Sequence, residues 1–172
     1  MPSFRTTRRV RHSASDMFEL VADVEKYPLF LPLCTGLRVR SRARDAQGRD
    51  VLTADMSVGY KAIRETFTSR VTLDRGALEI HVAYIDGPFS RLDNRWSFRD
   101  LETGGAGGRA ACEVGFFIDY EFRSRMLGLL MGSMFETAFR RFAEAFEARA
   151  DLVYGRRREA AAPPAPTAPP AV

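Results

Sequence analysis

Between residues 34 and 120, apolar and polar residues alternate almost without interruption. This period of two is typical of β-strands that turn one face to a core and the other to water. Turn sequences such as Asp74-Arg75-Gly76 and Asp86-Gly87-Pro88 divide the region into short segments. Because parallel strands need long crossover connections, strands joined this closely must be antiparallel. The sequence therefore predicts a meandering antiparallel sheet.

Seven segments of the chain have strand character. The predicted strands are 3–11, 36–44, 50–60, 63–74, 77–85, 91–100 and 109–120. Their apolar positions, such as Ile80 and Phe116, define a dry face, and charged residues such as His81 and Arg95 fall on the opposite face. The glycine-rich stretch 104–108 is interpreted as a flexible hairpin loop, because it lacks the following helix that a phosphate-binding loop needs.

Helical patterns occur in three places. Ser13 and Asp16 resemble a capping box and predict a short helix at 14–24. The segment 25–33 contains two prolines, which permit at most one helical turn at a time. A long helix is predicted at about 123–154 from an apolar stripe at helical spacing. The stripe consists of Met131, Phe135, Phe139, Phe142 and Phe146. We therefore expect an α+β fold in which a curved, seven-stranded antiparallel sheet wraps around a long C-terminal helix, with two short helices after the first strand.

The start of this long helix, residues 126–135, is apolar on all sides and contains Gly128 and Gly132. Glycine lowers helix propensity by about 1 kcal/mol relative to alanine. Three explanations remain open: close packing on the sheet, a flexible mouth of a cavity, or a patch that contacts a membrane or another subunit.

Composition defines the domain and excludes several classes of protein. The 172 residues are 45% hydrophobic and carry a net charge of +4, which suits one folded domain. We expect this domain at residues 1–155 and a disordered Ala/Pro-rich tail at 156–172, which carries half of the net charge.

No stretch reaches the roughly 18 apolar residues of a membrane span, and no signal peptide is visible, so we expect a cytoplasmic protein. Cys34, Cys112, His12 and His81 form no metal-binding pattern.

Four strings in the chain carry a resemblance to a known family. They are Val24–Cys34, Tyr84–Phe98, Asp119–Ser124 and Ala145–Ala150. Over residues 1–155 the chain resembles the coenzyme Q-binding branch of the polyketide cyclase and START-like superfamily. The resemblance implies a helix-grip (Bet v 1-like) fold, a hydrophobic tunnel for ubiquinone or its polyprenyl tail, and a lipid chaperone that supports respiration. A related bacterial branch is a ribosome-association toxin that blocks subunit joining.

The leading hypothesis is therefore non-catalytic binding of a polyprenyl quinone or similar lipid between sheet and helix, with no other cofactor and no metal. The predicted ligand-binding residues are Tyr27, Phe30, Phe89, Trp96, Phe98, Phe116, Met126, Leu130, Met134 and Phe135. Lys26 and Arg123 are candidate polar groups at the mouth of the cavity. A toxin-like ribosome partner is the first alternative, and a cyclase or aromatase enzyme is the second. The enzyme is disfavoured because the dry face offers no carboxylate or histidine for acid-base chemistry.

A basic surface is predicted on the second strand. Arg38, Arg40, Arg42 and Arg44 alternate along it, which would place four guanidinium groups on one face. Such a row suits phosphates of an anionic inner membrane, which would make the protein peripheral to that membrane, or phosphates of ribosomal RNA. A solvated edge that discourages aggregation is the other interpretation. The oligomeric state is left open by the sequence.

Overall fold

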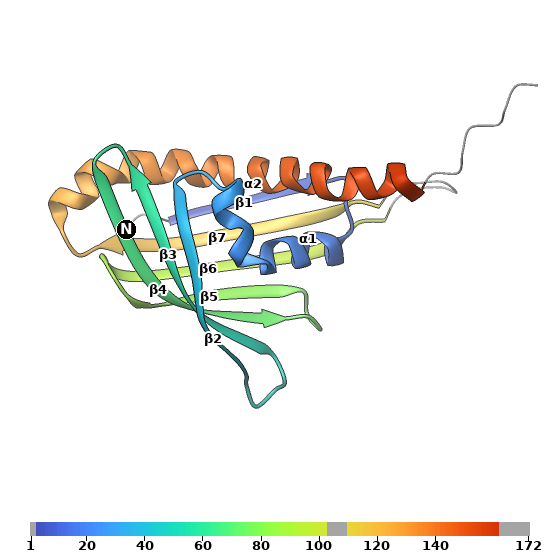
Figure 1. Ribbon diagram of the computed structural model, residues 1–172, viewed down its shortest axis with the longest axis horizontal. Coiled ribbons are helices and arrows are strands. Elements are labelled where there is room, and N and C mark those ends of the chain that lie inside the picture. The colour runs from blue at the N-terminus through green and yellow to red at the C-terminus, as the bar shows by residue number, and fades with distance from the viewer. Residues whose placement is uncertain (1–2, 103–109, 162–172) are drawn as a thin grey trace, which may run out of the picture.

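The computed structural model describes residues 3–102 and 110–161, and Figure 1 shows their arrangement. The elements are β1 (Ser3–Val10), α1 (Ala14–Ala22), the 3-10 helix η1 (Val24–Leu29), β2 (Cys34–Arg44), β3 (Asp50–Tyr60), β4 (Ile63–Asp74), β5 (Glu79–Asp86), β6 (Phe89–Asp100), β7 (Cys112–Phe122) and α2 (Arg125–Ala161). The strands form one antiparallel sheet in the order β1-β7-β6-β5-β4-β3-β2. The predicted fold class is confirmed.

Local sequence signals account for most of the element boundaries. Every predicted strand begins and ends within three residues of the observed one. The hydroxyl of Ser13 accepts a hydrogen bond of 3.1 Å from the backbone N–H of Asp16, which confirms the N-cap of α1. The helix ends at Ala22, two residues earlier than predicted, because the chain turns directly into η1.

The long helix extends further than predicted. α2 continues to Ala161, so the first residues of the expected tail are helical. The residues Arg156 to Ala161 are good helix formers, and the first proline of the tail follows only at Pro163. The domain boundary at residue 155 and the disorder of the tail stay predictions, since residues 162–172 lie outside the described residues. The predicted hairpin loop at 104–108 also lies outside them.

The sheet curves, and α2 runs along it over β1 and β7 while α1 covers another part of the same face (Figure 1). In β7 every second residue from Cys112 to Tyr120 is buried, as the alternation predicted. Phe146 of α2 packs edge-on against Trp96 of β6, with ring centroids 5.1 Å apart. The dry face and the apolar stripe therefore form one core between sheet and helix.

Candidate ligand-binding cavity

An apolar cavity of about 100 Å³ lies between the sheet, η1 and α2. Residues of β2 to β7 form its floor, and α2 contributes four phenylalanine rings. The aromatic side chains that line it are Tyr27, Phe67, Phe89, Trp96, Phe116, Phe135, Phe139, Phe142 and Phe146. The cavity exists because bulky rings from a curved sheet and a straight helix meet at edges and leave unfilled space.

The structure brings five of the ten predicted ligand-binding residues to this cavity. These are Tyr27, Phe89, Trp96, Phe116 and Phe135. Their role in binding stays a prediction, but their shared position agrees with it.

The other five predicted residues lie elsewhere. Phe98 contacts the Phe18 ring of α1 at a centroid distance of 5.9 Å, because it lies beyond the cavity on β6. Phe30 packs edge-on against Phe146, and Met126 and Leu130 are exposed on the first turns of α2. Sequence spacing identified these residues as apolar, but it did not tell a cavity wall from a filled core or a surface.

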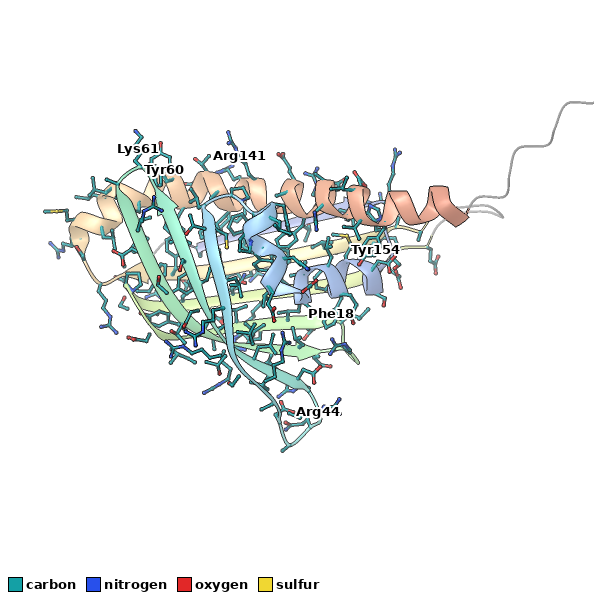
Figure 2. The ribbon with its side chains drawn as sticks, in the orientation of Figure 1. Phe18, Arg44, Tyr60, Lys61, Arg141 and Tyr154 are labelled. Carbon is teal, nitrogen blue, oxygen red and sulfur yellow. The ribbon has the colours of Figure 1, made fainter. Side chains whose placement is uncertain are left out.

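Met134 lines a separate surface groove of about 340 Å³. Pro32 and Leu33 belong to both the groove and the inner cavity and separate the two. Tyr60 of β3 and Arg141 of α2 also line the groove, and Figure 2 shows these two side chains near each other. Leu33 adopts a positive φ of 67°, which is uncommon for a leucine and holds the chain in a tight corner here.

Three polar side chains interrupt the apolar lining. The hydroxyl of Tyr27 donates a hydrogen bond to the backbone oxygen of Val21. Asn94 donates from Nδ2 to the backbone oxygen of Phe117 at 2.8 Å and accepts from Trp96 Nε1 at 3.1 Å. Ser69 is the third polar side chain and is 5% exposed.

Sequence reasoning missed Ser69 and Asn94, although the pattern contained them. Each occupies a dry-face position of its strand, Ser69 between Phe67 and Val71, and Asn94 between Leu92 and Trp96. A polar residue at the inward position of an alternating strand is the signal that identifies them.

Tyr27 is the one titratable side chain among the described residues that line the cavity. Burial raises its pKa far above the usual value, so its hydroxyl stays protonated at neutral pH. Neither predicted polar group of the mouth, Lys26 or Arg123, belongs to this lining. Arg123 instead donates from Nε to the backbone oxygen of Phe89 at 2.9 Å. The cavity therefore suits an uncharged ligand.

Neither Cys34 nor Cys112 belongs to the lining of the cavity. Both are buried free thiols, and burial raises the pKa of Cys34 and of Cys112 to about 11. A thiol with such a pKa remains protonated and unreactive at neutral pH.

The first turns of α2 expose apolar side chains. Met126 is 71% exposed, Leu129 85% and Leu130 56%. A Cβ on Gly128 would meet Phe122 at an ordinary 3.8 Å, and one on Gly132 would meet nothing within 4 Å. Close packing on the sheet therefore does not explain the two glycines. None of the helices in the described residues is long and apolar enough to cross a membrane.

A β-bulge divides the predicted basic surface of β2. A register shift between Val39 and Ser41 places one extra residue, Arg40, in the ladder with β3. The extra residue at such a bulge reverses which positions of the strand face the core. Arg38 therefore lies opposite Asp55 of the outer face, whereas Arg42 lies opposite the buried Leu52 of the inner face. The prediction that Arg38, Arg40, Arg42 and Arg44 share one face is therefore wrong.

Ion pairs also reduce the free positive charge of this strand. Arg40 Nε lies 2.6 Å from Asp55 Oδ2, and Arg44 Nε lies 3.4 Å from Asp50 Oδ1. Arg42 pairs with Glu25 of η1. Figure 2 shows Arg44 near the β2–β3 turn, at the other end of these strands from Tyr60 and Lys61. The four arginines thus do not form a continuous phosphate-binding row.

The convex face of the sheet carries charged residues, as the sequence predicted, and the structure pairs several of them. His81 Nε2 lies 2.5 Å from Asp93 Oδ1, and both Arg91 Nε and Arg91 Nη2 donate to Asp119 at 3.1 Å. Arg91 holds the pKa of Asp119 below its usual range. These pairs fix strand register and solubility and lie on the side of the sheet away from the cavity.

The protein has a helix-grip fold of the START-like class. Its curved, seven-stranded antiparallel sheet wraps around one long helix and encloses an apolar cavity. Residues 10–147 match the family described as polyketide cyclase / dehydrase and lipid transport. The chain belongs to this family.

Two curated relatives illustrate the range of the family. The chain is 35% identical over 157 residues to the ribosome association toxin RatA of Escherichia coli K12, covering 91% of this chain and 92% of the relative. It is 27% identical over 146 residues to the coenzyme Q-binding protein COQ10 homolog B, mitochondrial, of Xenopus laevis, covering 84% of this chain and 56% of the relative.

Solved structures agree with the fold. The 18 kDa protein CC1736 of Caulobacter crescentus superposes with a TM-score of 0.70 at 33% identity, covering 90% of this chain and 99% of that one. The Zhui aromatase/cyclase of Streptomyces sp. R1128 gives a TM-score of 0.63 at 21% identity, covering 93% and 96%. Because its identity is only 21%, the similarity to the aromatase/cyclase concerns the fold alone.

Proposed function

We propose that this protein binds a polyprenyl quinone, or a similar uncharged isoprenoid lipid, in the cavity between sheet and α2 and carries it without chemical change. The observation that carries this proposal is the lining, which is almost wholly aliphatic and aromatic and contains no charged side chain among the described residues. The family description, which includes lipid transport, and the similarity to a coenzyme Q-binding protein support it. Such a carrier would support respiratory electron transport.

The size of the cavity implies that it opens when ligand enters. At about 100 Å³ it is smaller than the roughly 300–1,000 Å³ of ordinary ligand pockets. The start of α2 is suited to move, because its two glycines weaken the helix and few groups cover it. We expect the tail of the ligand to pass between this segment and the Pro32–Leu33 corner.

Trp96 provides a direct test, because it is the sole tryptophan of the chain and lines the cavity. Titration with a short-chain ubiquinone is expected to quench its fluorescence, and organic extraction of the purified protein is expected to yield an isoprenoid. Ala54→Leu, which fills the cavity from β3, should weaken the quenching, whereas Ala62→Leu in the exposed β3–β4 turn should not. Absence of both an extracted isoprenoid and quenching would contradict the proposal.

We also propose a peripheral contact with an anionic membrane through the start of α2. Exposed Met126, Leu129 and Leu130 follow the exposed Arg123 and Arg125, a combination that suits insertion of apolar side chains beside lipid phosphates. Leu129→Ser should reduce co-sedimentation with anionic vesicles. Leu152→Ser, which changes a leucine 45% exposed near the other end of α2, is the matched control. Equal binding by both variants and the wild type would exclude this surface. A cytoplasmic protein that visits the inner membrane remains our prediction.

Ribosome association is the second candidate function. The 35% identity to RatA over nearly the whole chain favours it. Exposed Arg5 and Arg9 on the outer face of β1 are better placed for RNA phosphates than the divided row on β2. This candidate would be supported if the wild type co-sediments with ribosomal subunits at low salt and the Arg5→Ser, Arg9→Ser double variant does not. No sedimentation by the wild type would exclude it.

A cyclase or aromatase activity is supported by fold likeness alone. The cavity has no carboxylate or imidazole among the described residues that line it, and Tyr27 is held protonated. We therefore do not propose a catalytic step.

A further inference from the structure

Ser69 is an unusual residue for the floor of an apolar cavity. It lies in the middle of β4, on the same face as the buried Phe67 and Val71, and is 5% exposed. Its hydroxyl makes no hydrogen bond with any residue that the structure describes, whereas the other two polar side chains of the lining, Tyr27 and Asn94, are both hydrogen-bonded.

Among the described residues the fully enclosed polar atom without a partner is His12 Nδ1, so the unpaired Ser69 oxygen is not sealed in the core but borders the space of the cavity. The directly opposite residue on β3, Ala54, is also buried and carries no polar atom. Alanine at position 69 would continue the apolar floor in the same way. What the serine adds is a hydrogen-bonding group that faces the cavity.

We propose that the Ser69 hydroxyl donates a hydrogen bond to an oxygen of the bound lipid, so that the oxygenated ring of a quinone enters the cavity and its isoprenoid tail points outward. This inference rests on the proposed function and adds the orientation of the ligand. Because no charged side chain lines the cavity in the described residues, the buried end is a neutral carbonyl or hydroxyl rather than a carboxylate or phosphate.

Asn94 offers a second donor for the same ring. Its amide uses one Nδ2 hydrogen toward Phe117, which leaves the other available. Ser69 and Asn94 lie on β4 and β6 with β5 between them, and the register places Asn94 level with Val71, two residues along from Ser69. Two strand spacings combined with this offset put their backbones about 12 Å apart. A six-membered ring with oxygens at opposite positions, each accepting a hydrogen bond of about 2.8 Å, suits this span.

The test compares two ligands that differ only at the ring. Decylubiquinone and decylbenzene compete with the uncharged fluorescent probe N-phenyl-1-naphthylamine for the purified full-length protein. The wild type should prefer decylubiquinone. Ser69→Ala should lower the affinity for decylubiquinone by about tenfold, the contribution of one hydrogen bond, and leave that for decylbenzene unchanged.

Ser57→Ala is the matched control, because its hydroxyl lies on the other face of the sheet, 3.0 Å from that of Thr66. Unchanged decylubiquinone affinity in Ser69→Ala would overturn the orientation and leave the proposed function intact. An equal loss for both ligands would show that Ser69 acts through cavity shape, which also overturns the hydrogen bond. If neither ligand binds the wild type, the proposed function fails together with this inference.

Discussion

The indole N–H of Trp96 donates a hydrogen bond of 3.1 Å to Oδ1 of Asn94, two residues earlier on the same face of β6. The same amide fastens β6 to the backbone of β7 through Phe117. A polar pair thus fixes the orientation of the largest ring in the cavity wall. Removal of the Asn94 amide would leave the buried Trp96 N–H unpaired.

Asn94→Leu should therefore destabilise the protein by about 1–3 kcal/mol, since it leaves the Trp96 N–H without its partner and removes the side-chain bond to the Phe117 carbonyl. Urea unfolding measures this loss. Trp96→Phe in the same background removes the orphaned donor, so the double variant should lose less than the sum of the two single variants. Additive losses would mean that the pair is not coupled.

Phe146 should be the most sensitive of the aromatic residues from α2. It is 2% exposed and packs against Tyr27, Phe30 and Trp96. Phe146→Ala is expected to cost about 3–5 kcal/mol in unfolding free energy. Leu130→Ala, on the same helix but 56% exposed, should change it little. A similar cost for both would contradict the assigned packing.

Gly87 should not tolerate a side chain. Its φ of +139° disfavours any other residue, and an added Cβ would lie 2.9 Å from the Phe67 Cα of β4. Gly87→Ala should cost about 2 kcal/mol or more in thermal or urea unfolding.

Gly132 offers the opposite case, because a Cβ there meets nothing within 4 Å and the residue is helical. Gly132→Ala should stabilise the protein by up to about 1 kcal/mol. If this helix must open for ligand entry, the variant should also slow quinone uptake, which stopped-flow quenching of Trp96 measures. A destabilised Gly132→Ala variant would contradict the open space beside this glycine.

Asp55 should contribute to the pH dependence of stability. The Thr68 hydroxyl and then Arg40 donate to its carboxylate and hold its pKa below the usual range. When folding lowers the pKa of a carboxyl group, the charged group stabilises the folded protein at pH values above the pKa of the unfolded chain, about 3.9. This stabilisation is lost as the pH falls through the lower pKa of the folded protein. Asp55→Asn should therefore be less stable than wild type at pH 7, and the difference should shrink below about pH 4. A difference that does not change with pH would exclude this linkage.

Local patterns predicted most of the architecture, because strand and helix periodicities follow directly from backbone geometry. The Ser13 cap, the alternation in β7 and the stripe from Met131 to Phe146 all depend on residues close in the chain. The candidate site was predicted only in part. Phe98 and Phe116 look equivalent on their strands, yet Phe116 lines the cavity while Phe98 packs under α1.

The amino-acid sequence by itself determined that a sheet with one dry face would enclose one long apolar helix. Only the tertiary structure decided where that core is incomplete, because unfilled space depends on how side chains from distant strands meet. It also decided the facing of the β2 arginines, since one inserted residue at Arg40 changes the register of everything after it. The tertiary structure also decided that the Ser69 hydroxyl has no hydrogen-bond partner among the described residues, because this depends on the residues that surround it in space.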